Sequence, residues 1–396
     1  MIDGGASSRN IRVRAALVAI AVVAAAFPGV VVLGGYFPDF QAIGRYGAYL
    51  TVAMPWLLLI TAAATLLVGI ALSIGGGVFT RLLALAVGAV LGGAVLAEIQ
   101  LAGVATAHGA AFSPLRQVQP PAAVHDPTRR VIFATVEGMP LAADLWLPDQ
   151  APGAAPASRR PAVVFAHGGS FIGGDLGTRS WLFATLAERG YPVMDIQYRL
   201  APPPRWHDAP ADVLCALGWL AGHAEELGVD PNRIVLIGDS SGGSLALVAG
   251  YAAGTGRIEP SCPGSTVRPA GIIAIEPAAD LEGIWMDRTI DDGSSTYPEA
   301  YIGGPPSVYP DRYAAASPFD YIRPGLPPTL IVTGANDHLV RLARVQSIVD
   351  ALRVVGAPTT FIVVPFGDHG IDVDPNGFGA QLLESVVPAF MAGLGG

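Results

Sequence analysis

Three long apolar runs dominate the first 107 residues of the chain. They lie at residues 15–36, 49–70 and 80–100, and none carries the polar face of an amphipathic soluble helix. Each run is long enough to cross a hydrocarbon core of about 30 Å as a helix of about 20 residues. We therefore expect residues 1–107 to form an N-terminal transmembrane region with three spans.

The distribution of arginines predicts how these spans are oriented. Arg9, Arg12 and Arg14 precede the first span, so the positive-inside rule places the N-terminus in the cytoplasm. Three crossings then place everything after residue 107 on the extracytoplasmic side of the cell membrane. Residues 9–26 also fit a cleavable signal peptide, which would remove one span but leave the later domain on the same side.

The rest of the chain has the pattern of an α/β domain. Residues 108–130 are proline-rich without an apolar period, which is typical of a linker. Residues 131–396 alternate helical patterns with apolar, β-branched runs, which indicates a mostly parallel sheet with helices on both faces. Eight such runs lie at residues 131–136, 141–147, 162–167, 192–198, 233–238, 271–277, 329–334 and 360–366. Only EGMP joins the first two, so we expect an antiparallel hairpin at the sheet edge.

A serine lies at the join between one of these strands and the following helical pattern. The sequence GDSSGG places Ser240 between Gly238 and Gly242. Glycines on both sides allow a sharp strand-to-helix turn, which presents the serine Oγ at the carboxyl end of the sheet. This arrangement predicts a nucleophile elbow.

A serine nucleophile needs a base, and the base needs a group that orients it. His369 follows the last predicted strand, and Asp337 follows the strand before it, so both belong to the same sheet edge as Ser240. This gives the chain order serine, acid, histidine that the architecture expects. Asp280, which follows the strand at residues 271–277, is an alternative acid.

Acyl transfer also needs hydrogen-bond donors for the oxyanion. Gly168 and Gly169 follow a buried strand in the sequence AVVFAHGGSFIGG, and their backbone N–H groups are candidate donors. The N–H of Ser241, directly after the predicted nucleophile, is another.

Five motifs together resemble the hormone-sensitive-lipase-like esterases of the α/β-hydrolase superfamily. They are HGGS, YRLAP, GDSSGG, GANDH and DHG. The similarity extends over most of residues 126–396. It implies an α/β-hydrolase fold with Ser240 as nucleophile, His369 as base and Asp337 as acid. It implies oxyanion donors at Gly168, Gly169 and Ser241. The chain departs from the family where HGGS lacks a frequent third glycine and where Ser241 replaces a common alanine.

These features predict a membrane-anchored serine esterase or lipase that cleaves carboxylic esters, with short to medium acyl chains, through an acyl-enzyme. We expect no cofactor and no metal. The same triad could serve an acyltransferase or lipid-remodelling enzyme, and a non-catalytic membrane protein with a hydrolase-like binding domain is a further alternative. The chain contains no lysine, which excludes a Ser-Lys dyad, and its net charge of -9 gives no support to a nucleic-acid partner.

Two questions stay open at the level of sequence. The two cysteines, Cys215 and Cys262, could form one disulfide or remain free thiols. The spans could deliver substrate from the membrane, but we expect them to act only as a tether for the catalytic domain.

Overall fold

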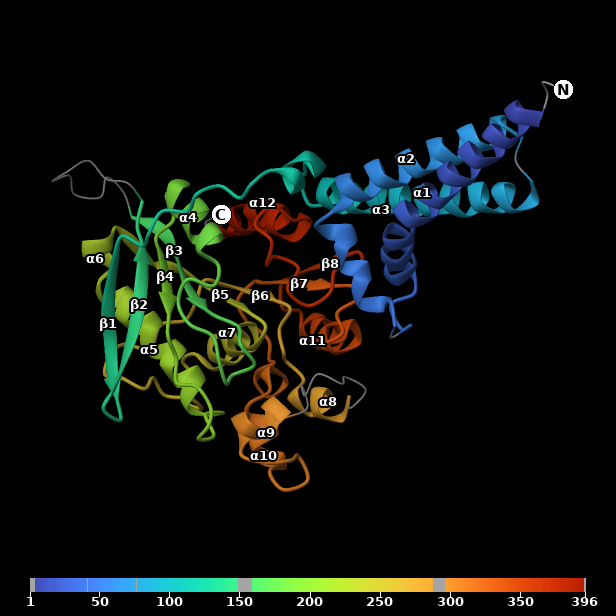
Figure 1. The fold of residues 1–396 in the computed structure, drawn as a ribbon. Coiled ribbons are helices and arrows are strands. Elements are labelled where there is room, and N and C mark those ends of the chain that lie inside the picture. The colour runs from blue at the N-terminus through green and yellow to red at the C-terminus, as the bar shows by residue number, and fades with distance from the viewer. Residues whose placement is uncertain (1–3, 41, 76, 149–158, 288–295, 395–396) are drawn as a thin grey trace. The chain divides into compact units, whose positions relative to one another are not determined.

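The computed structural model describes the chain except residues 1–3, 41, 76, 149–158, 288–295 and 395–396 (Figure 1). The chain divides into two compact units. The first comprises residues 1–121 together with 364–382, and the second comprises residues 122–363 together with 383–396. Each unit is described by itself.

Three long helices form most of the first unit. They are α1 (Gly4–Tyr36), α2 (Met54–Ser73) and α3 (Val78–Ala107). All three are long and apolar enough to cross a membrane, as the sequence predicts. The second begins at Met54 rather than at residue 49, because Gly44–Thr51 forms the 3-10 helix η1 and Pro55 takes the first turn of α2. A second 3-10 helix, η2 (Pro114–Val118), follows α3.

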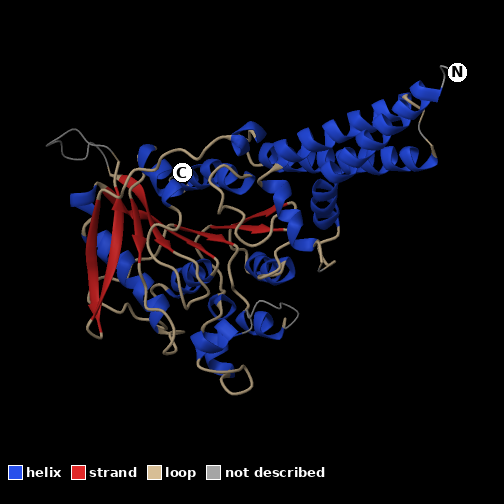
Figure 2. Cartoon of the chain, viewed as in Figure 1, coloured by secondary structure: helices blue, strands red, loops and turns tan. Residues whose placement is uncertain are grey.

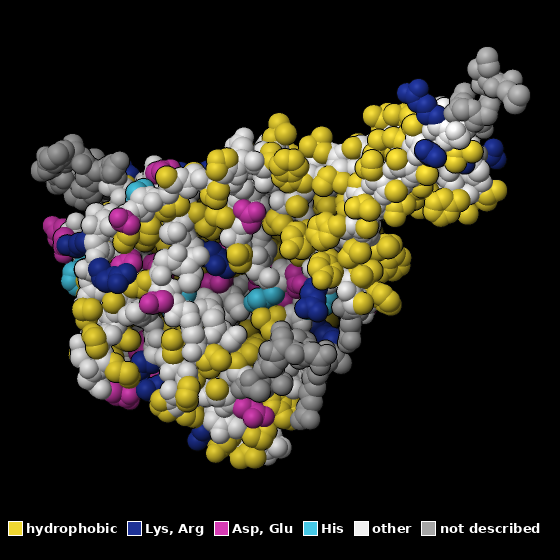
Figure 3. Space-filling view, in the orientation of Figure 1, with side chains coloured by type: hydrophobic (Ala, Val, Ile, Leu, Met, Phe, Trp, Pro, Cys, Tyr) yellow, Lys and Arg dark blue, Asp and Glu magenta, His cyan; other side chains and the backbone are white. Residues whose placement is uncertain are grey.

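Small side chains fill the cluster where the three helices meet, and many large apolar side chains lie on the outside of the helices. Ala21, Ala64 and Val68 are buried where the helices meet. A Cβ added to Gly34 would lie 2.2 Å from the Ile43 carbonyl oxygen, so α1 and the segment before η1 approach as closely as their backbones allow. Figure 3 shows the apolar side chains on the outer surface of the helices. Small residues at helix contacts are typical of helices packed in lipid.

The second unit is built on an eight-stranded sheet in the order β1-β2-β4-β3-β5-β6-β7-β8 (Figure 2). The strands are β1 (Arg129–Val136), β2 (Met139–Trp146), β3 (Arg160–Ala166), β4 (Val193–Ile196), β5 (Val229–Asp239), β6 (Gly271–Ile275), β7 (Thr329–Gly334) and β8 (Thr359–Val364). The predicted edge hairpin of β1 and β2 is confirmed, and β2 also pairs antiparallel with β4. The pairs from β4 through β3, β5 and β6 to β7 are parallel.

Helices cover the central strands, which explains why those strands are apolar along their whole length. The helix α4 (Ser180–Glu188) packs against β2 and β4, while α5 (Asp208–Gly222) and α7 (Ser241–Ala252) pack together and contact β3 and β5. Every residue of β6 and β7 is buried. The remaining helices are α6 (Ala224–Leu227), α8 (Leu281–Met286), α9 (Thr296–Ile302), α10 (Pro310–Ala315), η3 (Pro318–Tyr321), α11 (Leu342–Val354) and α12 (Phe378–Gly393).

The two cysteines form a disulfide, which answers the question that the sequence left open. Cys215 in α5 is bonded to Cys262, 47 residues further along the chain, with their Cα atoms 5.4 Å apart. The bridge ties α5 to the segment between α7 and β6. It therefore restrains the unfolded chain across the region that contains Ser240.

We expect replacement of Cys215 and Cys262 together by alanine to lower the free energy of unfolding by about 2–4 kcal/mol, because the unfolded chain gains conformational freedom. Chemical unfolding of the full chain measures this change. Dithiothreitol should shift the wild-type curve by a similar amount and leave the double variant unaffected. A wild-type curve that is insensitive to the reductant would contradict the prediction.

Candidate active site

Ser240 lies on a sharp turn between β5 and α7. Its backbone has φ 53° and ψ -118°, a conformation that non-glycine residues rarely adopt. A Cβ added to Gly238 would lie 2.2 Å from the Gly242 carbonyl oxygen, and one added to Gly242 would lie 2.0 Å from the Ala166 carbonyl oxygen. Both glycines are therefore required for the turn to form against β3. This is the geometry of a nucleophile elbow.

Backbone hydrogen bonds hold the elbow against the end of β6. The Ser240 N–H donates to the Ile275 carbonyl oxygen at 2.8 Å, and the Ala278 N–H donates to the Ser240 carbonyl oxygen at 3.1 Å. Ser240 is half-buried between a buried strand end and a buried helix start. Bonds at both sides of the residue stabilise a backbone conformation that would otherwise be unfavourable.

The glycine-rich loop after β3 approaches the elbow through Asp239. The Gly168 N–H donates to Asp239 Oδ1 at 2.7 Å. Gly169 is exposed and has φ 129°, and a Cβ there would lie 2.2 Å from the Gly173 carbonyl oxygen. The structure thus brings the predicted donors Gly168 and Gly169 to the residue beside the predicted nucleophile. It also engages one of their two N–H groups with a carboxylate.

Three further side chains hold this loop in shape. The Tyr198 hydroxyl donates to the His167 carbonyl oxygen at 2.8 Å, and the two rings stack with centroids 4.5 Å apart. Burial lowers the pKa of His167 below its ordinary value, which favours a neutral imidazole. The Arg179 guanidinium lies 3.0 Å from Asp239 Oδ2 in a buried ion pair. The HGGS, YRLAP and GDSSGG motifs therefore meet in one place.

Asp337 lies on the loop after β7, and its carboxylate is held by the loop's own backbone. Asp337 Oδ1 accepts hydrogen bonds from the N–H groups of Leu339 at 2.8 Å and Val340 at 2.7 Å. The side chain is buried. Two hydrogen bonds to one oxygen hold the side chain in a single orientation. The alternative acid, Asp280, instead caps α8 by accepting from the Gly283 N–H at 2.9 Å.

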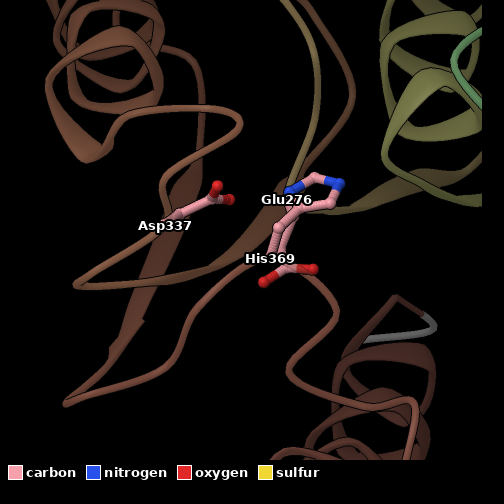
Figure 4. Close-up of side chains that lie close together, drawn as sticks. All are labelled: Glu276, Asp337 and His369. Carbon is pink, nitrogen blue, oxygen red and sulfur yellow. The ribbon is translucent and has the colours of Figure 1, made fainter. Parts of the chain in front are cut away.

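A second buried carboxylate lies beside Asp337 and was not predicted from the sequence. Glu276 directly follows β6, has φ 47°, and offers a carboxylate oxygen within 4.8 Å of one on Asp337 (Figure 4). Its N–H donates to the Val332 carbonyl oxygen at 2.7 Å, which holds it at the end of β7. The rule that identified Asp337, an acid at the carboxyl end of a parallel strand, would also have identified Glu276.

His369 lies on the loop that follows β8, in the segment 364–382 that belongs to the first unit. Figure 4 shows its side chain on this loop. His369 is half-buried, and its backbone N–H donates to Asp368 Oδ1 at 2.8 Å. The other predicted site residues, Ser240, Ser241 and Asp337 among them, belong to the second unit.

The eight-stranded sheet with a serine elbow between β5 and α7 defines the α/β-hydrolase fold. Residues 144–352 match the BD-FAE family, and this match covers more than half of the 396 residues. The chain belongs to the BD-FAE family. The resemblance to hormone-sensitive-lipase-like esterases is thereby confirmed.

Relatives of the chain are named as esterases or ester hydrolases. The chain is 28% identical to esterase LipC of Mycobacterium tuberculosis over 228 residues, which cover 55% of each protein. An ethyl acetate hydrolase of Pseudomonas putida is 40% identical over 117 residues, 29% of this chain and 36% of that protein. The chain spans about half the length of LipC and of a second Mycobacterium tuberculosis relative, the probable carboxylic ester hydrolase LipM.

Solved structures show the same fold. Esterase 2 of Thermogutta terrifontis superposes with a TM-score of 0.57 and 24% identity, covering 70% of this chain and 98% of that one. At this identity the likeness shows the fold alone.

We expect Gly242→Ala to lower the free energy of unfolding by about 2–3 kcal/mol, because the added Cβ would overlap the fixed Ala166 carbonyl oxygen. Thermal unfolding of the full chain measures the loss. Gly264→Ala is the matched control, since a Cβ there meets nothing within 4 Å. Equal stability of the two variants would contradict the described turn.

Proposed function

We propose that the protein is a membrane-anchored serine hydrolase that cleaves carboxylic esters, with Ser240 as nucleophile, His369 as base and Asp337 as acid. The observation that carries the proposal is the Ser240 turn, which holds a serine in an unfavourable backbone conformation between two obligatory glycines. Membership of the BD-FAE family and relatives named as esterases support the reaction class.

The chemistry is a two-step acyl transfer. Ser240 Oγ attacks the ester carbonyl carbon while the His369 imidazole accepts its proton, and the Asp337 carboxylate stabilises the resulting imidazolium. Collapse of the tetrahedral intermediate breaks the bond to the alcohol oxygen, which takes the proton from His369. Water, deprotonated by His369, then attacks the acyl carbon, and the second tetrahedral intermediate collapses by breaking the bond to Ser240 Oγ. The serine oxygen takes the proton back from His369 and the carboxylic acid is released. No cofactor or metal takes part in this sequence.

The oxyanion of each intermediate needs donors that are aimed at it. Because the Gly168 N–H donates to Asp239, we assign the donor role to the N–H groups of Gly169 and Ser241. Gly168 then serves to anchor the loop on the residue that precedes the nucleophile. This assignment narrows the three donors that the sequence predicts to two.

We place the second unit on the extracytoplasmic side of the membrane. Arg9, Arg12 and Arg14 lie near the N-terminal end of α1, which favours a cytoplasmic N-terminus. The disulfide between Cys215 and Cys262 supports the same orientation, since such bonds persist in oxidising compartments. Short to medium acyl chains remain our expectation for the substrate.

Ser240→Ala should reduce hydrolysis of p-nitrophenyl esters by the full chain in detergent by at least about 10³-fold, because no other group replaces the attacking oxygen. Labelling by a fluorophosphonate should vanish with it. Persisting hydrolysis in the variant would overturn the assignment. Labelling of the wild type without hydrolysis, together with acyl transfer to an added alcohol, would identify an acyltransferase instead.

Replacing each of the two neighbouring carboxylates by its amide tests which of them orients His369. We expect Asp337→Asn to lower kcat by about 10⁴-fold, because the imidazole then loses its orienting carboxylate, and we expect Glu276→Gln to cost less than about 10-fold. Steady-state kinetics of the two variants beside wild type measures both effects. A reversed order would assign the acid role to Glu276.

A further inference from the structure

The loop that carries His369 is built into the unit that contains the three apolar helices. We define the histidine loop as residues 365–377, between the end of β8 and the start of α12. Both flanking elements continue into the second unit, but the loop itself belongs to the first. A simple tether would need no contact with this loop.

Arg116 in η2, just beyond α3, forms the polar part of the attachment. Its Nε donates to Asn376 Oδ1 at 3.3 Å, and its Nη2 donates to the Pro375 carbonyl oxygen at 3.2 Å. Asn376 Nδ2 in turn donates to the Gln119 carbonyl oxygen at 2.8 Å. Asn376 is buried and Arg116 is half-buried, so these bonds are partly shielded from water.

Ser113 and Gln381 form a second, reciprocal pair. The Ser113 N–H donates to Gln381 Oε1 at 2.8 Å, and Gln381 Nε2 donates back to the Ser113 carbonyl oxygen at 3.2 Å. The same Nε2 donates to the Asn376 carbonyl oxygen at 2.8 Å. Gln381 therefore connects the segment after α3 to the end of the histidine loop, and it is only 3% exposed.

Aromatic contacts form the apolar part of the attachment. Phe366, three residues before His369, packs edge-on against Tyr36 at the end of α1, with ring centroids 5.1 Å apart. Phe112 and Phe378 make a similar contact at 4.9 Å. The first residues of the loop are thus held by α1, and its last residues by the segment after α3.

We propose that the first unit positions the catalytic histidine, with Arg116 and Tyr36 as positioning residues. The apolar helices then contribute to catalysis instead of serving only as a tether. The inference rests on the proposed role of His369 as base. A loop of this length is ordinarily more mobile than the strand and helix that it connects, whereas a base must be held within about 0.5 Å of its productive position. Contacts at both ends of the histidine loop supply that restraint.

Arg116→Ala in the full chain tests the proposal. Because an error of about 1 Å in placing a catalytic group can cost about 10²-fold, we expect kcat for a water-soluble ester to fall by about 10- to 100-fold with KM changed less than about twofold. Arg116→Lys should restore part of the rate through a single hydrogen bond. Arg129→Ala, which removes an exposed arginine paired with Glu226 on the second unit, is the matched control and should retain wild-type kcat.

A double-mutant cycle shows whether the effect acts through the histidine. In a His369→Ala background, Arg116→Ala should cause no further loss, because there is no imidazole left to misplace. A full additional loss in that background would overturn the proposal, as would wild-type kcat for Arg116→Ala. If His369→Ala itself retained wild-type kcat, the proposed catalytic role would fail instead, so the two failures are distinguishable.

Tyr36 provides an independent variant in case Arg116→Ala does not fold. Tyr36→Phe keeps the ring against Phe366 and loses only the hydroxyl bond to the Gly93 carbonyl oxygen, so its kcat should stay near wild type. Tyr36→Ala removes the ring and should lower kcat by about 10-fold. The unfolding temperatures of the two variants are compared to check that Tyr36→Ala is folded. Equal kcat for the two folded variants would overturn the role of this contact.

Discussion

The approach of two backbones at Gly242 is the constraint on which the fold of the second unit around Ser240 depends. A Cβ at this position would lie 2.0 Å from the carbonyl oxygen of Ala166, so α7 can begin beside β3 only with glycine there. That approach fixes where α7 starts, and the Ser240 turn follows from it. The bonds of Ser240 to Ile275 and Ala278 then link the turn to β6. Three strands thereby determine the position of one side chain.

Asp239 extends this constraint to the loop after β3. One of its oxygens accepts from the Gly168 N–H and the other lies 3.0 Å from the Arg179 guanidinium, so the carboxylate is buried but compensated. A buried carboxylate whose two oxygens both have partners is held rigidly, because losing either partner costs free energy in a buried environment. Asp239 therefore supports the glycine-rich loop after β3.

The histidine side of the site is organised differently. Ser240 and Asp337 are held by elements of the second unit, whereas the loop bearing His369 contacts α1 and the segment after α3. Under our proposal, catalysis requires both units, and the apolar helices contribute to the placement of a proton acceptor. An enzyme of this design would couple its activity to the integrity of its three apolar helices.

Local signals in the sequence determined the secondary structure and the positions of most candidate site residues within it. Apolar runs predicted the three helices and eight strands, and the position of Ser240 and Asp337 at strand ends followed from the parallel sheet. Tertiary structure alone decided that the two cysteines pair, that the Gly168 N–H donates to Asp239, and that Glu276 lies beside Asp337. It also decided that the histidine loop joins the first unit. Those features depend on side chains far apart in the chain, and no periodicity or local motif encodes such distances.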